Sequence, residues 1–295
     1  MAFNMILYDK DKETGAAVIT MNKPEVLNAW GGRMKEEMME AINDAGEDPS
    51  VTGLIFTGAG RGFGAGGYRA IGGKVTPGYE PALSDAGTPQ SHYDWLPGDE
   101  ERAMMGLSHD TPHLIERLFY FDKPTIAAIN GVVAGGHTAL ISVCDIRIGS
   151  ENARYRCAFT RDGFVPDVGS SYWLPKLVGV GKALEIAYTN DFIDAQELLR
   201  IGLLNQVVSP DELIPYCKNM VKRMKQIAPS VLFASKKAIR ACGKATQRDL
   251  EEGYMLERWA SGLIDTEERE ESRKSNIERR PPAYKGRGIK MNIRW

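Results

Sequence analysis

Residues 123–148 read KPTIAAINGVVAGGHTALISVCDIRI, and this stretch decides the fold. The run Thr125–Ile129 is rich in β-branched residues and alanine and is bounded by proline and Asn-Gly, which predicts a buried strand. The pair Gly135-Gly136 follows, and a helical pattern runs from His137 to Val143. The stretch therefore predicts a strand, a glycine turn and a helix of small residues.

The glycine pair in this turn offers main-chain groups to a ligand. Glycine lets a ligand approach the backbone closely, and the free N–H groups and positive dipole end of a helix favour negative charge. We interpret Gly135-Gly136 as one half of an oxyanion site. A tight strand-to-helix turn without a ligand would contain the same pair, so the pattern alone leaves both interpretations open.

A second glycine-rich stretch follows another predicted strand, Val51–Phe56. Residues 58–67 read GAGRGFGAGG, with six glycines in ten residues, which favours a loop whose backbone lines a ligand. No Gly-Lys-Ser/Thr sequence is present and no helical pattern follows, so this is neither a P-loop nor a dinucleotide fingerprint.

Composition narrows the class of protein. With 295 residues, 43% of them hydrophobic, the chain can bury a sizeable core, and its net charge of -2 gives no general attraction for nucleic acid or an anionic membrane. Its four cysteines lack metal-ligand spacing, so we expect a reduced, cytoplasmic protein without structural zinc. No stretch approaches the length and apolarity of a membrane span.

The remaining segments predict a mixed α/β chain. Two apolar runs separated by a polar Gly-containing loop, Phe3–Tyr8 and Ala16–Met21, favour a hairpin. Further on, the composition rich in Pro, Gly, Asp and Ser around residues 69–99 predicts an inserted loop, whose aromatic residues favour a cover over the site. Other predicted elements are a helix with Met34, Met38, Met39 and Ile42 on its buried face, a helix over 100–121, strands over 145–148, 153–159 and 205–208, and helices over 181–188, 195–201, 211–226, 230–241 and 245–279.

Two polar patterns in these segments deserve separate interpretations. His109 and His113 lie one helical turn apart, but no HExxH sequence and no third ligand accompany them, so we expect no metal site. Pro166 and Gly169 bracket Asp167 just before a helical pattern that starts at Ser170 or Ser171. Asp167 is therefore expected at a helix entrance, where it would act as a chemical group or only as an N-terminal charge.

Taken together, the motifs resemble the crotonase family, also called the enoyl-CoA hydratase/isomerase superfamily. The resemblance covers most of the chain outside the insert and rests on their order and spacing. Its parts are NKPEVLNA at 22–29, LIFTGAGRGFGAGG at 54–67, the opening stretch at 123–148, VPDVGSSYWLPKLVG at 165–179 and ALEIAYTNDFIDAQELLRIGLLNQVV at 183–208.

The resemblance implies a fold and an assembly. The expected fold is an α/β spiral of ββα units that forms two roughly perpendicular sheets, followed by a helical C-terminal region that trimerises. On this basis residues 1–200 would form the spiral core and residues 201–295 the helical region. A homotrimer or homohexamer is expected.

The resemblance also implies a ligand, an acyl-CoA thioester whose carbonyl oxygen is held by the backbone N–H groups of Gly67 and Gly136. Contacts with CoA would fall on Val26, Leu27, Ala65 and Gly67, with Lys285 a weak candidate for phosphate. CoA would be part of the substrate, so no separate cofactor is expected.

This chain departs from the hydratases of the family at the two glutamates that manage water and protons. By resemblance those positions are Ala139 and Phe159, and neither side chain exchanges a proton. Some family isomerases acting on ring-derived acyl-CoAs lack both glutamates and carry an acid at the position of Asp167. We therefore expect Asp167 to be the catalytic acid or base, with Phe159 and Val165 forming an apolar wall that raises its pKa.

The expected reaction is an allylic proton shift between the α and γ carbons of an enoyl thioester, through a dienolate held at Gly67 and Gly136. One alternative is hydration or C–C hydrolysis of a cyclic or β-keto acyl-CoA, with Asp167 or Asp162 activating water. Halide displacement by Asp167 and a catalytically dead acyl-CoA-binding scaffold are further alternatives. His137 is a secondary candidate, with capping of the helix start as its simpler role.

Overall fold

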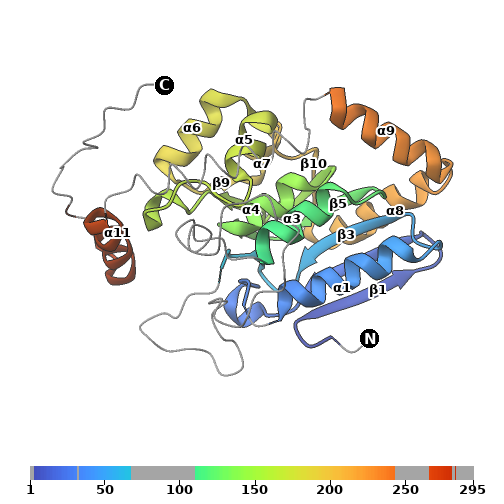
Figure 1. The fold of residues 1–295 in the computed structure, drawn as a ribbon, viewed down its shortest axis with the longest axis horizontal. Coiled ribbons are helices and arrows are strands. Elements are labelled where there is room, and N and C mark those ends of the chain that lie inside the picture. Colours follow the sequence, from blue (N-terminus) through green and yellow to red (C-terminus); the bar gives the residue numbers. More distant parts are fainter. Residues whose placement is uncertain (1–2, 32, 68–109, 243–265, 281–282, 284–295) are drawn as a thin grey trace, which may run out of the picture.

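The computed structural model describes residues 3–31, 33–67, 110–242, 266–280 and 283 (Figure 1). The predicted insert at 69–99, His109, residues 245–265 and Lys285 lie outside the described residues. Predictions that concern them stay predictions.

The larger sheet has six strands in the order β1-β2-β3-β5-β7-β10. The first two strands pair antiparallel and the others parallel, with Thr125 of β5 opposite Leu54 of β3 and Ile146 of β7 opposite Ile126. The strands are β1 (Ile6–Asp11), β2 (Ala16–Met21), β3 (Gly53–Gly58), β5 (Thr125–Ile129), β7 (Ile146–Ser150) and β10 (Gln206–Val208).

The smaller sheet has four short strands in the order β4-β6-β8-β9. Each of β4, β6 and β8 directly follows a strand of the larger sheet, so the chain passes repeatedly from one sheet to the other. This repeat agrees with the predicted series of ββα units. The strands are β4 (Gly62–Gly64), β6 (Val132–Ala134), β8 (Arg154–Arg156) and β9 (Ile193–Asp194).

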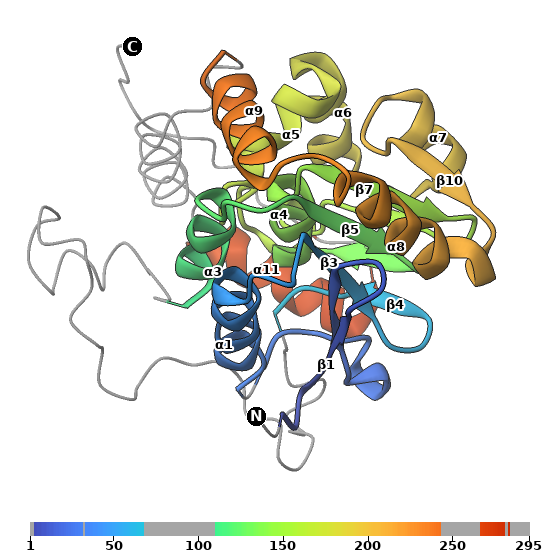
Figure 2. The same ribbon diagram turned by 90° about the vertical axis from the view of Figure 1, so that its right-hand side faces the viewer.

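Helices cover both faces of the larger sheet. Figure 2 shows α1 and α3 on one side of it and α8 on the other, where Leu213, Cys217 and Val221 pack against the strands. The helices are α1 (Met34–Glu47), α3 (Asp110–Phe119), α4 (Gly136–Val143), α5 (Ser170–Val178), α6 (Val180–Thr189), α7 (Ala195–Arg200), α8 (Leu213–Met224), α9 (Pro229–Cys242) and α11 (Thr266–Glu278), with 3-10 turns η1 (Pro24–Val26), η2 (Thr160–Asp162) and η3 (Pro210–Glu212).

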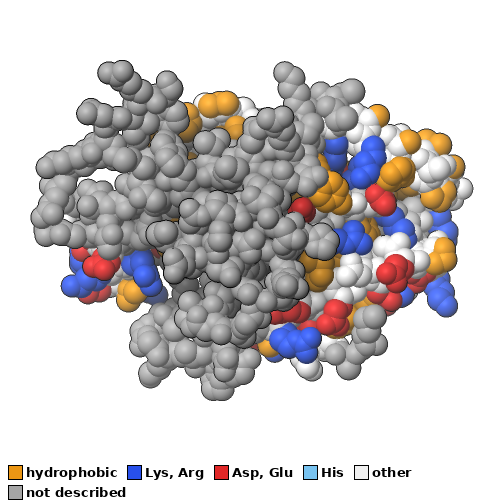
Figure 3. Space-filling model, viewed as in Figure 1, with side chains coloured by type: hydrophobic (Ala, Val, Ile, Leu, Met, Phe, Trp, Pro, Cys, Tyr) orange, Lys and Arg blue, Asp and Glu red, His pale blue; other side chains and the backbone are white. Residues whose placement is uncertain are grey.

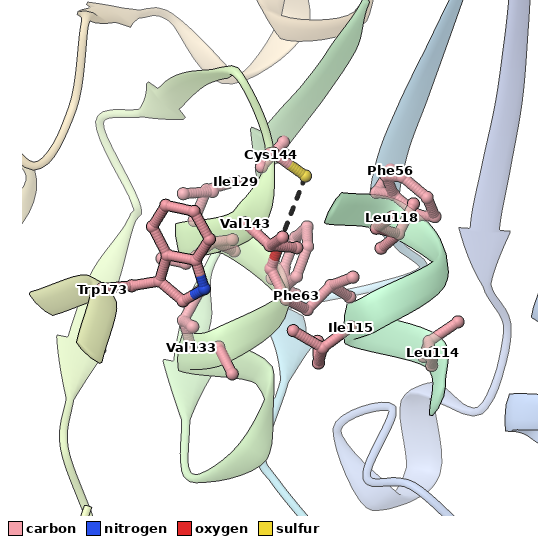
Figure 4. Close-up of a cluster of buried hydrophobic side chains, with 14 of the residues drawn as sticks. Phe56, Phe63, Leu114, Ile115, Leu118, Ile129, Val133, Val143, Cys144 and Trp173 are labelled. Atoms are coloured by element: carbon pink, nitrogen blue, oxygen red, sulfur yellow. Dashed lines mark hydrogen bonds between the residues drawn. The ribbon is translucent and has the colours of Figure 1, made fainter. Parts of the chain in front are cut away.

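The main core lies between the larger sheet and helices α1, α3 and α4. Met34, Met38 and Ile42 recur at helical spacing and are fully buried, as the sequence predicts. Phe63 of the short strand β4 enters the same cluster, close to Ile115 of α3 (Figure 4). The glycine-rich turn that leads into β4 is thus anchored to the core by a large side chain.

The predicted strand Thr125–Ile129 is confirmed, whereas the first strand is displaced from Phe3–Tyr8 to Ile6–Asp11. That strand forms an edge of the sheet, where polar side chains are tolerated. Its Lys10 forms ion pairs with Asp44 in α1 and with Asp48, the residue that follows α1. Strands β4, β6 and β9 were not predicted, because each has only two or three residues and too little apolar alternation to be detected.

The surface carries charges of both signs. On the coloured part of the face drawn in Figure 3, basic and acidic side chains are interspersed, in keeping with the small net charge. Across the described residues, every helix is too short or too polar to traverse a lipid bilayer.

A partly buried ion cluster joins α9 to the sheet. Asp145 accepts hydrogen bonds from Lys236 and Arg240, both at 2.8 Å, and from the backbone and hydroxyl of Thr125 at 2.9 Å. Burial alone would raise the pKa of Asp145, but the charges of Lys236 and Arg240 outweigh it, and the pKa falls below its ordinary value. The carboxylate is therefore a structural anion that stabilises the fold when it is charged.

We expect Asp145→Asn to lower the free energy of unfolding by about 1–3 kcal/mol, because two partly buried cations lose their counter-charge. Since the folded pKa lies below the unfolded value, the stabilisation is present above about pH 4 and is lost as the pH falls below it. Denaturant unfolding across pH measures both effects. The control Asp122→Asn removes an exposed carboxylate 3.5 Å from Lys237 and should change stability by less than about 1 kcal/mol. Equal losses in the two variants would contradict the assigned role.

Candidate active site

Two asparagines hold the first glycine-rich turn, residues 58–67, which runs from the end of β3 through β4. Asn28 is fully buried and donates from Nδ2 to the carbonyls of Ala59 and Gly62, at 2.9 and 2.7 Å. Asn130 donates to the carbonyl of Gly60 at 2.9 Å and accepts from the N–H of Gly58 at 3.1 Å. The upstream backbone of the turn is therefore held from two sides, by asparagine side chains that belong to other segments.

The second turn joins β6 to α4. Gly135 has φ 54° and ψ −135° and caps the helix, and Gly136 is its first residue. The carbonyl of Gly135 accepts hydrogen bonds from the N–H and the hydroxyl of Thr138, at 2.8 and 2.7 Å. The N–H of Gly136 belongs to the first helical turn, where no intrahelical acceptor is available.

These two turns touch through their glycines. A Cβ placed on Gly66, which has φ 92°, would lie 3.2 Å from Cα of Gly135 and 3.5 Å from N of Gly136. The N–H of Gly66 donates to Nδ1 of His137 at 3.0 Å. The predicted neighbourhood of the two glycine-rich loops is therefore observed, and only residues without side chains permit it.

His137 and Trp30 pack around this contact. Their rings lie 4.1 Å apart between centroids and are inclined by 33°. A Cβ on Gly136 would lie 2.7 Å from Cζ3 of Trp30, and one on Gly64 would overlap the imidazole of His137. Each ring thus occupies the space that a side chain at one of these glycines would need.

The role of His137 differs from the helix cap suggested by the sequence. The imidazole is fully buried, and burial lowers its pKa to about 3, so it is neutral at physiological pH. Because Nδ1 accepts the hydrogen bond from Gly66, the ring proton is assigned to Nε2. His137 is thus an acceptor that holds the first turn against the second.

The same hydrogen bonds set the directions of the two candidate donors. The carbonyl of Gly66 accepts from the N–H of Trp30 at 2.7 Å, and in a trans peptide the following N–H points the opposite way. The N–H of Gly67 therefore points away from Trp30. By the same reasoning the N–H of Gly136 points out of the helix start, away from Thr138.

The residues expected to contact CoA lie beside the first turn. Val26 ends η1, and Leu27 follows with φ 52° and accepts from the N–H of Ala65 at 3.0 Å. All three are partly exposed, whereas Gly67 is exposed, and no atom of the described residues lies within 4 Å of a Cβ placed on it. The predicted set is thus brought together at one end of the turn.

Asp167 lies in a tight turn before α5. Its carbonyl accepts from the N–H of Ser170 at 2.9 Å, and the helix cap is Gly169. Between them Val168 has φ 49°, a strained conformation for a β-branched residue and one that clusters at functional sites. Asp167 itself is half-buried.

The thiol of Cys157 is buried two residues before Phe159. Burial raises the pKa of Cys157 to about 11, the N–H of Phe159 opposes this rise, and the charge of Asp167 adds to it. Phe159 is 9% exposed, and Ala139, on the inner face of α4, is fully buried.

Within the described residues, no group of three or more His, Cys, Asp and Glu side chains is placed to hold a metal ion. His113 lies on α3, but its possible partner His109 is outside the described part of the chain.

Comparison with known proteins decides the family. A family model described as enoyl-CoA hydratase/isomerase matches residues 11–74 and 98–287. The chain belongs to the enoyl-CoA hydratase/isomerase family. The unmatched residues 75–97 fall within the insert predicted at 69–99.

Relatives of this family enzyme carry different reaction names. A crotonyl-CoA hydratase from Syntrophomonas wolfei is 32% identical over 95% of this chain and 97% of its own length. A 1,2-epoxyphenylacetyl-CoA isomerase from Escherichia coli is 28% identical over 82% of this chain and 86% of its own. The crystal structure of an enoyl-CoA hydratase/isomerase from Pseudoalteromonas atlantica covers 95% of this chain and all of its own, with a TM-score of 0.75 at 21% identity, and confirms the fold.

Sequence reasoning predicted that the two glycine-rich loops come together but missed the side chains that hold them. Asn28, Trp30, His137 and Thr138 all stand inside or directly beside the motifs, yet none was given its observed contact. Asn-Gly at 130–131 was a detectable turn signal, whereas the contact of Thr138 with Ser170 joins residues 32 positions apart and leaves no local pattern.

We expect Gly64→Ala to lower the free energy of unfolding by about 1–3 kcal/mol, because the added methyl group overlaps the ring of His137 and forces it to move. Gly181→Ala is the matched control, since it adds a methyl group on helix α6 where no described atom lies within 4 Å. That change should be neutral or stabilising by up to about 1 kcal/mol. Urea unfolding of both variants measures the difference. A Gly64→Ala protein as stable as the control would contradict the close packing of Gly64 against the ring of His137.

Proposed function

We propose that this chain is an enoyl-CoA isomerase in which Asp167 carries the proton and the N–H groups of Gly67 and Gly136 hold the thioester oxygen. The observation that carries the proposal is the contact between the two glycine-rich turns, together with the half-buried position of Asp167 in the turn before α5. The positions matched to the hydratase glutamates hold Ala139 and Phe159, both buried and neither ionisable.

The two main-chain donors would serve the step in which charge develops on oxygen. Removal of a proton next to a thioester places negative charge on the carbonyl oxygen, and fixed N–H donors stabilise that charge without having to reorganise. Gly67 and Gly136 supply such donors because the carbonyls before them are already bonded to Trp30 and Thr138. Loss of one donor of this type typically costs about 10²–10³-fold in rate.

Asp167 would act first as base and then as acid. In a 3-enoyl thioester the carboxylate removes a proton from the α carbon, the C–H electrons form the dienolate, and the carboxyl returns the proton to the γ carbon. The double bond then lies between the α and β carbons, and Asp167 is again a carboxylate. One carboxyl group therefore suffices for a reaction without net gain or loss of protons.

The second candidate is a hydratase or hydrolase, which the name of the Syntrophomonas relative favours. In that case Asp167 or Asp162 would activate water for attack on a cyclic or β-keto acyl-CoA. A scaffold that binds acyl-CoA without reaction is the non-enzymatic alternative. The homotrimer or homohexamer expected from the family also stays a prediction.

Isotope labelling separates these functions. We expect incubation with a 3-enoyl-CoA in deuterated water to give the 2-enoyl product with solvent deuterium, and labelled water to add no oxygen-18. Asp167→Asn should lower this rate by about 10²–10⁴-fold, because general acid–base catalysis contributes that much. Mass spectrometry of the thioesters measures both labels.

Asp162→Asn is the matched control, since it removes a neighbouring carboxyl group in η2 and should leave isomerisation near the wild-type rate. Incorporation of oxygen-18 that depends on either aspartate would instead establish the hydratase or hydrolase. Full isomerase activity in a folded Asp167→Asn protein would remove Asp167 from the mechanism.

A further inference from the structure

The side chain of Thr138 connects the two halves of the proposed site. Thr138 lies in the first turn of α4 and is fully buried. Its hydroxyl donates to the carbonyl of Gly135 at 2.7 Å, and the same oxygen lies 3.0 Å from the hydroxyl of Ser170. The threonine oxygen thus contacts both the turn before α4 and the first residue of α5.

The direction of these bonds follows from the number of hydrogens. A threonine hydroxyl has one hydrogen to donate, and that hydrogen goes to Gly135. Ser170 must therefore be the donor in the 3.0 Å contact. Thr138 is fully buried and Ser170 is 1% exposed, so water is not at hand to replace a bond lost between these two hydroxyls.

Ser170 carries the connection on to the acid. Its N–H donates to the carbonyl of Asp167 at 2.9 Å, across the turn that contains the strained Val168. The hydrogen-bonded path therefore runs from the carbonyl of Gly135, through Thr138 and Ser170, to the backbone of Asp167. At one end it fixes the peptide whose N–H is the Gly136 donor, and at the other the turn that carries the carboxylate.

We infer that Thr138 is a positioning residue that sets the direction of the Gly136 N–H and, through Ser170, the place of Asp167 relative to it. This inference rests on the proposed function, because it concerns the same oxyanion site and the same carboxylate. A displacement of about 1 Å in such groups costs up to about 10²-fold in rate. The N–H of Thr138 still holds Gly135 when the hydroxyl is removed, so the loss should be partial.

The chain offers a near-isosteric test. Thr138→Val removes the hydroxyl and keeps the shape, whereas Thr138→Ser keeps the hydroxyl. We expect Thr138→Val to lower kcat for isomerisation by about 10- to 100-fold with KM changed less than about threefold, and Thr138→Ser to stay within about threefold of wild type. A kcat that is unchanged in a folded Thr138→Val protein would overturn the inference.

A spectroscopic measurement tests the donor without turnover. The probe is a dimethylaminocinnamoyl-CoA, whose absorption moves to longer wavelength when hydrogen bonds polarise its thioester carbonyl. We expect a red shift on binding to the wild type, a smaller one with Thr138→Val and a restored one with Thr138→Ser. Thr125→Val is the matched control, because Thr125 is equally buried and its hydroxyl bonds Asp145, outside the site. The red shift should survive in that control even if stability falls.

Ser170→Ala tests the other end of the path and also serves if Thr138→Val does not fold. It should keep the red shift but slow exchange of the α proton with deuterated water by about tenfold, because only the support of the Asp167 turn is weakened. Unchanged exchange in Ser170→Ala would overturn the link to Asp167.

Failure of the inference and failure of the proposed function give different results. A red shift of wild-type size in Thr138→Val overturns the role of Thr138 and leaves the oxyanion site intact. Absence of any red shift in the wild type overturns the oxyanion site and the inference with it. A red shift that depends on Thr138 in a protein without isomerase activity supports the inference and rejects only the isomerase.

Discussion

The contact between Gly66 and Gly135 is the constraint on which the site depends. Two chain segments approach so closely that a Cβ on either glycine would lie 3.2 Å from the other's Cα. Gly66 follows strand β4 and Gly135 follows strand β6. The pairing of these two strands in the smaller sheet therefore sets the approach of the glycines. The larger sheet supplies the rigid support, and the smaller one brings the turns together.

Polar contacts around this approach work by fixing carbonyl groups. The carbonyls of Gly66 and Gly135 are bonded to Trp30 and Thr138, and peptide planarity then determines where the next N–H points. His137 adds a neutral acceptor, and Asn28 holds the upstream part of the turn. The side chains nearest the proposed chemistry thus orient the backbone, and the one carboxylate proposed to react stands on a separate turn.

The sequence was sufficient for the family, the order of elements and the approach of the two glycine-rich loops, because strand periodicity and glycine-rich motifs are local signals. It was insufficient for β4, β6 and β9, which are too short to show a period. It also missed the contacts of His137 and Thr138, since these depend on partners 71 and 32 positions away. The helix start at residues 170–171 was predicted correctly from the Pro-Asp-x-Gly turn, and α5 begins at Ser170.

The overlap between a side chain at position 64 and the ring of His137 links the volumes of these two positions. A family member with a larger residue at the position of Gly64 would need a small one at the position of His137, and the imidazole acceptor would then be absent. Such a member would have to support the first turn by another bond to the N–H of residue 66. Correlated substitution at this pair should therefore divide the family into two structural types, according to whether a ring or a β-carbon fills the same space.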